Sequence, residues 1–217
     1  MITMHAVVVV PPFRDFYSTP HRQSSLGARV VAHVLAQHGV RVEFHDFASK
    51  PGGRTLALPE HLSHLADFVL PCETGPVSFF ARYRRFGPPI RTCAVETCAT
   101  RPEVLFVACF AFCYAAPAIE LAVACRERLP QSRIVLGGAG ASVYPSYFLR
   151  VHSIDYVLTG EAESVVPSFL DFLRGAIEKP AHVPNLWYRD ADGIRRAQAQ
   201  PRESADSPIS VATSSWL

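Results

Sequence analysis

The stretch HAVVVV, residues 5–10, is rich in β-branched valine and has no break before the proline pair that follows it. Such a run is typical of a strand that is covered on both faces in a parallel sheet. Residues 26–38 then place apolar side chains at helical spacing, Gly39 suits the end of that helix, and residues 40–47 alternate as a strand. Strand, helix and strand within about forty residues predict a right-handed βαβ unit.

The same alternation returns after residue 103. Three further apolar segments read as strands, each followed by a helical or hairpin pattern: strands at 103–113, 133–138 and 155–160, helices at 116–129, 144–151 and 164–177, and a hairpin at 183–196. The pattern predicts an α/β fold, namely a flavodoxin-like (Rossmann-like) doubly wound parallel sheet of five strands with a C-terminal β-hairpin. In the helix at 116–129 we expect Ala116, Ile119, Ala122 and Val123 to face inward.

These patterns suggest how the chain is organised. We expect one α/β domain over residues 1–178, with a long and partly helical insertion at 48–103 that is broken by prolines and glycines. A hairpin appendage at 179–198 and a flexible tail at 199–217, where periodicity is lost, complete the predicted division.

Composition excludes several classes of protein. Of the 217 residues, 49% are hydrophobic and 18% charged, which is typical of a globular chain and not of a disordered one. A formal net charge of +2 argues against nucleic acid or an anionic membrane as partner. The first apolar run is too short for a signal peptide or a membrane span, so we expect a soluble, cytoplasmic protein.

The stretch RIVLGGAGASVYPSYFL, residues 133–149, places three glycines within four residues at the end of a predicted strand. Gly137, Gly138 and Gly140 either make a tight strand-to-helix turn, or keep side chains away so that backbone N–H groups approach a bulky ligand. In doubly wound sheets ligands bind at the carboxyl ends of the strands. Four predicted loops lie at that edge: 11–25, 109–115, 137–142 and 160–163.

Common catalytic and metal-binding motifs are missing. No G-x-G-x-x-G follows the first strand, and neither a P-loop nor a G-x-S-x-G motif occurs. Cys109 and Cys113 lack the third cysteine that a radical SAM cluster needs, and Cys93 with Cys98 is no convincing second half of a zinc site. We therefore expect reduced, buried structural thiols, Cys125 included, and assign no metal site and no catalytic residue.

Glu161 and Glu163, in TGEAES, allow three interpretations. They could form an acid–base pair, cap the following helix, or accept a hydrogen bond from a ligand. The sequence favours capping, because residues two apart at a helix start point in different directions. His21, in the first ligand-side loop, is either a solvated histidine or a functional one.

Six segments form an ordered set along the chain: VVVVPPF (7–13), SLGARVVAHVLAQHGVRVEFHDF (25–47), RPEVLFVACF (101–110), RIVLGGAGAS (133–142), IDYVLTGEAES (154–164) and PNLWYRDADG (184–193). As a set, they resemble the N-terminal cobalamin-binding domain of cobalamin-dependent radical SAM enzymes. In that family a proline pair ends the first strand, glycines end the fourth, Gly-Glu-x-Glu follows the fifth, and a hairpin with an Asp-Gly turn leads to the radical SAM barrel.

The resemblance implies a corrinoid at the carboxyl edge of the sheet, held by residues from the four loops. The implied cofactor-binding residues are Pro11, Pro12, Phe13, Ser25, Leu26, Cys109, Phe110, Ala111, Gly137, Gly138, Ala139, Gly140, Ser142, Gly160 and Glu161. Cys109, Phe110 and Ala111 replace the small polar residues that the family often has there. Asp15, His21 and Gly27 do not have the Asp-x-His-x-x-Gly spacing that supplies a histidine to cobalt, so none is expected on the metal.

The resemblance also implies what the chain does not do alone. The sequence stops near where the barrel and its three-cysteine cluster motif would begin, so we expect no iron–sulfur cluster and no catalysis by this chain alone. The expected role is to hold cobalamin for a radical SAM or methyltransferase partner, either a separate subunit or a C-terminal domain. Two alternatives remain open: an independent small-molecule enzyme using Glu161, Glu163 or His21, and a ligand-free interaction or remnant domain whose sheet edge is closed by side chains.

Overall fold

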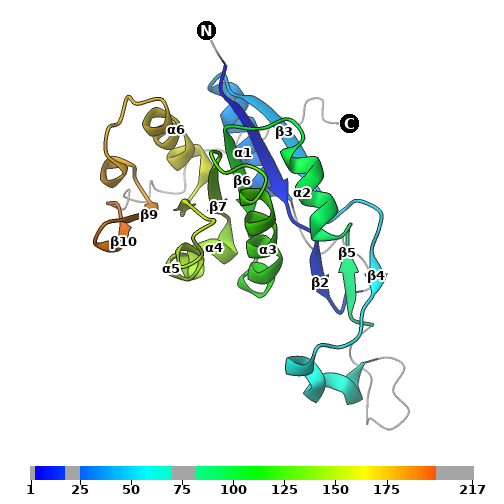
Figure 1. Cartoon of the computed structure of the whole chain (residues 1–217). Coiled ribbons are helices and arrows are strands. Elements are labelled where there is room, and N and C mark those ends of the chain that lie inside the picture. The colour runs from blue at the N-terminus through cyan, green and yellow to red at the C-terminus, as the bar shows by residue number, and fades with distance from the viewer. Residues whose placement is uncertain (1–2, 18–24, 70–81, 199–217) are drawn as a thin grey trace, which may run out of the picture.

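The computed structural model describes residues 3–17, 25–69 and 82–198, and within them a seven-stranded sheet forms the centre of the molecule (Figure 1). Its strand order is β10-β9-β8-β7-β6-β1-β3, and the five strands from β8 to β3 are parallel. The strands are β1 (His5–Val10), β3 (Arg41–Asp46), β6 (Val104–Ala108), β7 (Arg133–Gly137), β8 (Tyr156–Leu158), β9 (Leu186–Asp190) and β10 (Gly193–Arg196).

The predicted count of five strands is wrong for the sheet as a whole. The C-terminal hairpin is not separate from it: β9 pairs antiparallel with β8, with Tyr156 opposite Tyr188 and Leu158 opposite Leu186. The physical reason is that β8 would otherwise be an edge strand with a row of unpaired backbone groups. The hairpin itself turns between Asp190 and Gly193, where the sequence placed it.

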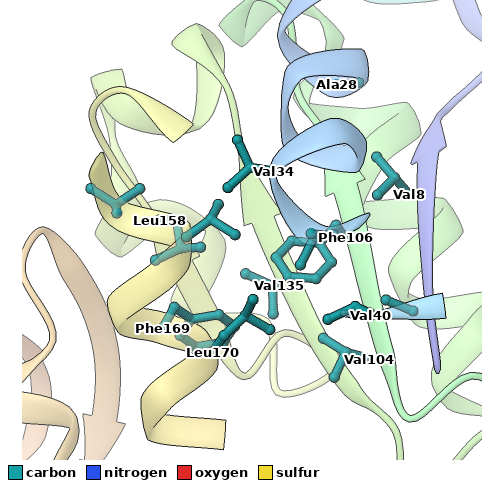
Figure 2. Close-up of a cluster of buried hydrophobic side chains, with 14 of the residues drawn as sticks. Val8, Ala28, Val34, Val40, Val104, Phe106, Val135, Leu158, Phe169 and Leu170 are labelled. Atoms are coloured by element: carbon teal, nitrogen blue, oxygen red, sulfur yellow. The ribbon is translucent and has the colours of Figure 1, made fainter. Parts of the chain in front are cut away.

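Helices cover both faces of the sheet. On one face lie α1 (Leu26–Gln37) and α6 (Ala162–Leu173), and on the other α2 (Ile90–Cys98) and α3 (Ala115–Arg126). Figure 2 shows the first layer, where Val34 from α1 and Phe169 from α6 approach Phe106 and Val135 on the strands. Successive residues of β6 alternate between the two cores, which is why its sequence is apolar without interruption.

Two predicted segments differ from the structure. The third parallel strand ends at Ala108, and the chain then leaves the sheet through the 3₁₀ turn η3 (Phe112–Tyr114). Helix α3 exposes Ala116 and Val123, which we predicted to face inward, and buries a broad face instead. Because α3 packs against both the sheet and α2, and is apolar around most of its circumference, periodicity alone did not define its buried side.

The described part of the predicted insertion contains the crossover helix α2 and two strands that join the segment after β1 in a small second sheet, which the sequence did not reveal. This sheet has the order β2-β5-β4 and extends beyond the end of β1 in Figure 1. Its strands are β2 (Phe13–Asp15), β5 (Arg84–Phe86) and β4 (Arg54–Thr55), with the 3₁₀ helix η2 (Glu60–Phe68) attached. Among the described residues, no helix has both the length and the apolar character needed to cross a membrane.

Candidate functional site

The loops after β1, β6, β7 and β8 emerge at one edge of the sheet, because these strands are parallel. They carry all the residues that the sequence analysis assigned to a cofactor. Pro11, Pro12 and Phe13 follow β1, Ser25 and Leu26 begin α1, Cys109–Ala111 follow β6, Gly137–Ser142 end β7 and form α4 (Ala139–Val143), and Gly160 and Glu161 follow β8. His21 lies outside the described residues.

The glycine run packs against the loop after β6. The backbone N–H of Cys109 donates to the carbonyl of Gly137 at 2.8 Å, and the N–H of Gly140 donates to the carbonyl of Cys109 at 3.0 Å. A Cβ on Gly138, whose φ is +102°, would lie 2.7 Å from the Cys109 oxygen, and one on Gly140 would lie 2.4 Å from the carbonyl carbon of Ala111. The close contact between the loops after β6 and β7 is therefore enough to explain Gly138 and Gly140, without any ligand.

Cys109 is a buried thiol. It is 1% exposed, and its Sγ donates to the carbonyl of Ala111 at 3.3 Å. Burial raises the pKa of Cys109 to about 12, so the group is neutral at physiological pH. Cys113, by contrast, is exposed, which corrects the prediction that it is buried. The pKa of the Cys113 thiol is nevertheless raised, first by its partial removal from solvent and then by the Asp15 carboxylate. In the part of the chain that the structure describes, no three histidine, cysteine or acidic residues are placed to hold a metal ion.

Side chains fill the space between the ends of β1 and β6. Phe13 is 1% exposed, stacks on Phe86 at 4.7 Å between ring centroids, and lies 5.0 Å from the ring of Tyr114. The Tyr114 hydroxyl donates to Asp15 Oδ2 at 2.5 Å. Burial, and secondly the Asp15 carboxylate, raise the pKa of Tyr114 well above its usual value, so it stays a donor. The strand order reverses between β1 and β6, because β3 lies on one side of β1 while β6, β7 and β8 lie on the other. Doubly wound sheets commonly bind ligands at such a reversal.

The edge is open over β6, β7 and β8. Phe110 is 41% exposed there, Leu26 at the start of α1 is 54% exposed, and further candidate positions with exposed atoms are Gly138, Ala139, Ser142, Gly160 and Glu161. Most of these residues are small, so a broad ligand would meet backbone and short side chains. The Ser142 hydroxyl donates to the Gly138 carbonyl at 3.1 Å, which leaves its lone pairs free to accept.

An exposed aromatic cluster at the same edge escaped the sequence analysis. Phe112 lies 5.1 Å from Tyr144 and 5.3 Å from Tyr147 between ring centroids, and all three side chains are exposed. Tyr144 precedes α5 (Pro145–Leu149), whose Phe148 is buried beneath Phe112 at 6.0 Å. In the sequence, the one sign of this cluster is that VYPSYFL (143–149) has more apolar side chains than one face of a short helix can bury. Only the fold brings Phe112 beside this segment.

The carboxylates after β8 only partly match the predicted capping role. Glu161 is the N-cap residue of α6 and Glu163 lies in the first turn, yet no side-chain hydrogen bond caps this helix. The Glu161 carboxylate is exposed, while its backbone carbonyl accepts from the N–H groups of Ser164 and Val165 at 3.2 Å. Ser25, the N-cap residue of α1, also makes no side-chain cap; its hydroxyl accepts from Arg29 Nε at 3.2 Å.

Solved structures with a similar fold include those of two enzymes. The radical S-adenosylmethionine methyltransferase TsrM from Kitasatospora setae, with cobalamin and a [4Fe-4S] cluster bound, matches 95% of this chain at 18% identity, with a TM-score of 0.59. The cobalamin-dependent S-adenosylmethionine radical enzyme OxsB, with aqua-cobalamin and S-adenosylmethionine bound, matches 93% at 14% identity, with a TM-score of 0.58. This chain shares its fold with both.

The shared fold covers only part of each enzyme. This chain spans 31% of the TsrM chain and 23% of the OxsB chain. No protein-family model matches the chain, and a search of curated proteins gives no match.

Proposed function

We propose that this chain is a cobalamin-binding module that holds a corrinoid for a radical SAM or methyl-transfer partner. The observation that carries the proposal is the fold match over 93–95% of the chain with enzymes solved with cobalamin bound. We assign the fold to the flavodoxin-like class, since its parallel strands lie in the order second, first, third, fourth, fifth along the chain. The resemblance to the N-terminal domain of the same class of enzymes supports this reading.

The chemistry of the open edge fits a wide, flat cofactor. We propose that Gly138, Ala139, Ser142 and Gly160 admit the macrocycle, and that Phe110 provides apolar contact at its border. Buried residues beneath them, including Pro11, Phe13 and Cys109, would support the loops. A bound corrinoid would supply methyl-transfer chemistry, and the protein would orient it and limit access of water.

The exposed aromatic cluster supports the partner in this proposal. Phe112, Tyr144 and Tyr147 lie beside the loops that would hold the cofactor, and aromatic side chains are enriched in protein interfaces. A partner that covers them would also close the open edge.

A specific observation favours a second function. The stack of Phe13, Phe86 and Tyr114 fills the end of the sheet between β1 and β6, which agrees with an interaction domain that holds no ligand. A visible-spectrum titration distinguishes the two functions. The 217-residue chain is mixed with hydroxocobalamin or methylcobalamin and then desalted.

The module proposal predicts retained corrinoid with a base-off spectrum. The test variant is Ala139→Phe, which fills the exposed edge without entering the core, and the matched control is Ala36→Phe on the exposed side of α1. Loss of retention in the first variant alone supports the assigned edge. No retention by the wild-type chain would leave the ligand-free interaction domain as the better reading.

A further inference from the structure

A cavity of about 580 Å³, open to solvent, lies at the other edge of the sheet, away from the candidate cofactor site. The segments that lead into β6 and β7 form it, together with Met4 before β1 and Leu173 at the end of α6. Because these segments precede parallel strands, the cavity belongs to the amino edge. Its volume is within the range of small-molecule sites.

Three arginines line this cavity: Arg101, Arg128 and Arg133. Arg128 makes one long hydrogen bond to the Ala124 carbonyl, at 3.3 Å, and Arg133 makes one to the Tyr156 hydroxyl, at 3.2 Å. None of the three is in an ion pair with a described residue. All three side chains are exposed, and each guanidinium has five N–H donors, so most of these donors face solvent and can be offered to a ligand.

The adjacent Arg126 has a structural role, and its hydrogen-bond partners differ from those of the three cavity arginines. It donates to the carbonyls of Pro130 and Ser132 at 2.8 and 2.7 Å, and to the Asp155 carboxylate at 2.5 Å. It therefore ties α3 to the segments that enter β7 and β8. The cavity arginines have no comparable set of partners.

The backbone at Arg101 adds an independent observation. Its φ is +50°, a left-handed conformation just beyond the end of α2, where glycine or asparagine is the usual residue. Its N–H donates to the Cys98 carbonyl at 3.1 Å, which holds this turn. An arginine at this position costs backbone strain that glycine would avoid, and it places a guanidinium in the cavity lining.

The remaining lining indicates which anion would bind. Glu103 is the one carboxylate among the lining residues, and its Oε1 accepts from the backbone N–H of His5 at 3.0 Å. Much of the rest is apolar, including Val104 and Leu129. Positive charge beside apolar walls suits a molecule with an anionic group and an apolar or aromatic body.

We propose that this cavity binds a phosphorylated small molecule of about nucleotide size, with its phosphate groups on Arg101, Arg128 and Arg133. The proposal does not depend on the corrinoid proposal, because it concerns the opposite edge of the sheet. The test is calorimetric titration of the full chain with ADP, and in parallel with inorganic pyrophosphate and with adenosine, at low ionic strength.

We expect saturable binding of one ADP per chain, with pyrophosphate and adenosine each binding more weakly. Arg101→Gly and Arg128→Gln should each weaken ADP binding by about 10-fold or more, since each removes charge-assisted hydrogen bonds. Arg91→Gln, an exposed arginine at the start of α2 and outside the cavity lining, is the matched control and should change affinity by less than about 2-fold.

Arg101→Gly also separates binding from folding. Glycine relieves the left-handed backbone, so urea unfolding should show a variant at least as stable as the wild type. The proposal is overturned if the wild-type chain shows no saturable ADP binding, or if Arg101→Gly and Arg128→Gln bind ADP as tightly as the wild type does. It is also overturned if Arg91→Gln loses as much affinity as these variants, or if pyrophosphate binds as tightly as ADP. Corrinoid retention by Arg101→Gly should equal that of the wild type.

Discussion

Gly138 and Gly27 show how differently two glycines can be used in one chain. A Cβ on Gly27, in the first turn of α1, would meet no atom within 4 Å. A Cβ on Gly138 would meet the Cys109 oxygen at 2.7 Å, on a backbone with a φ of +102°. The first glycine only loses conformational entropy on folding, whereas the second is required by its neighbour.

This contrast makes opposite predictions for the same substitution. Gly138→Ala should lower the free energy of unfolding by about 1–3 kcal/mol, because the methyl group strains the backbone and displaces the Cys109 carbonyl. Gly27→Ala should raise it by about 0.5–1 kcal/mol. Urea unfolding followed by circular dichroism measures both, and a change of the same sign in the two variants would contradict this account.

At the scale of elements, the C-terminal hairpin completes the sheet. Leu186 and Val183 are fully buried, and Tyr188 and Ala197 are nearly so. The Arg189 guanidinium donates to the carbonyls of Leu149 and Ile154, at 2.7 and 2.9 Å through Nη2. The hairpin is therefore part of the core and anchors the end of α5.

A pair of truncations tests this role. A chain ending at residue 178 loses buried side chains and leaves β8 as an unpaired edge, so it should aggregate or unfold without a cooperative transition. A chain ending at residue 198 keeps the hairpin and should unfold cooperatively near the wild-type midpoint. Thermal and urea unfolding of both chains measure this, and a cooperative transition in the shorter chain would show the hairpin to be dispensable.

At the scale of the whole molecule, buried thiols on the α2 and α3 face link stability to pH. Burial raises the pKa of Cys93 to about 11 and that of Cys109 to about 12, from an ordinary value of 9.0. The unfolded chain ionises these thiols near pH 9, whereas the folded chain keeps them neutral. Their contribution to stability is thus fully present below about pH 9 and is lost as pH rises toward about 11–12.

The free energy of unfolding should therefore fall above about pH 9, by up to about 1.4 kcal/mol per pH unit for each thiol. Replacing both by alanine should reduce this slope, although the variant is less stable at neutral pH. Urea unfolding at about pH 8 and about pH 10 compares the two chains. An unchanged slope in the double variant would assign the alkaline loss to other groups.

The sequence by itself determined the α/β alternation and the carboxyl-edge loops, because strand and helix periods and turn residues are local signals. It did not determine the buried side of α3, since an evenly apolar helix has no periodic face to read. Only the tertiary structure decided that Gly138 and Gly140 face the loop after β6, and that Phe13, Phe86 and Tyr114 stack. The same holds for Arg101, Arg128 and Arg133, which line one cavity from separate segments. Contacts between residues far apart in the chain depend on how the strands are ordered, and no local pattern encodes that order.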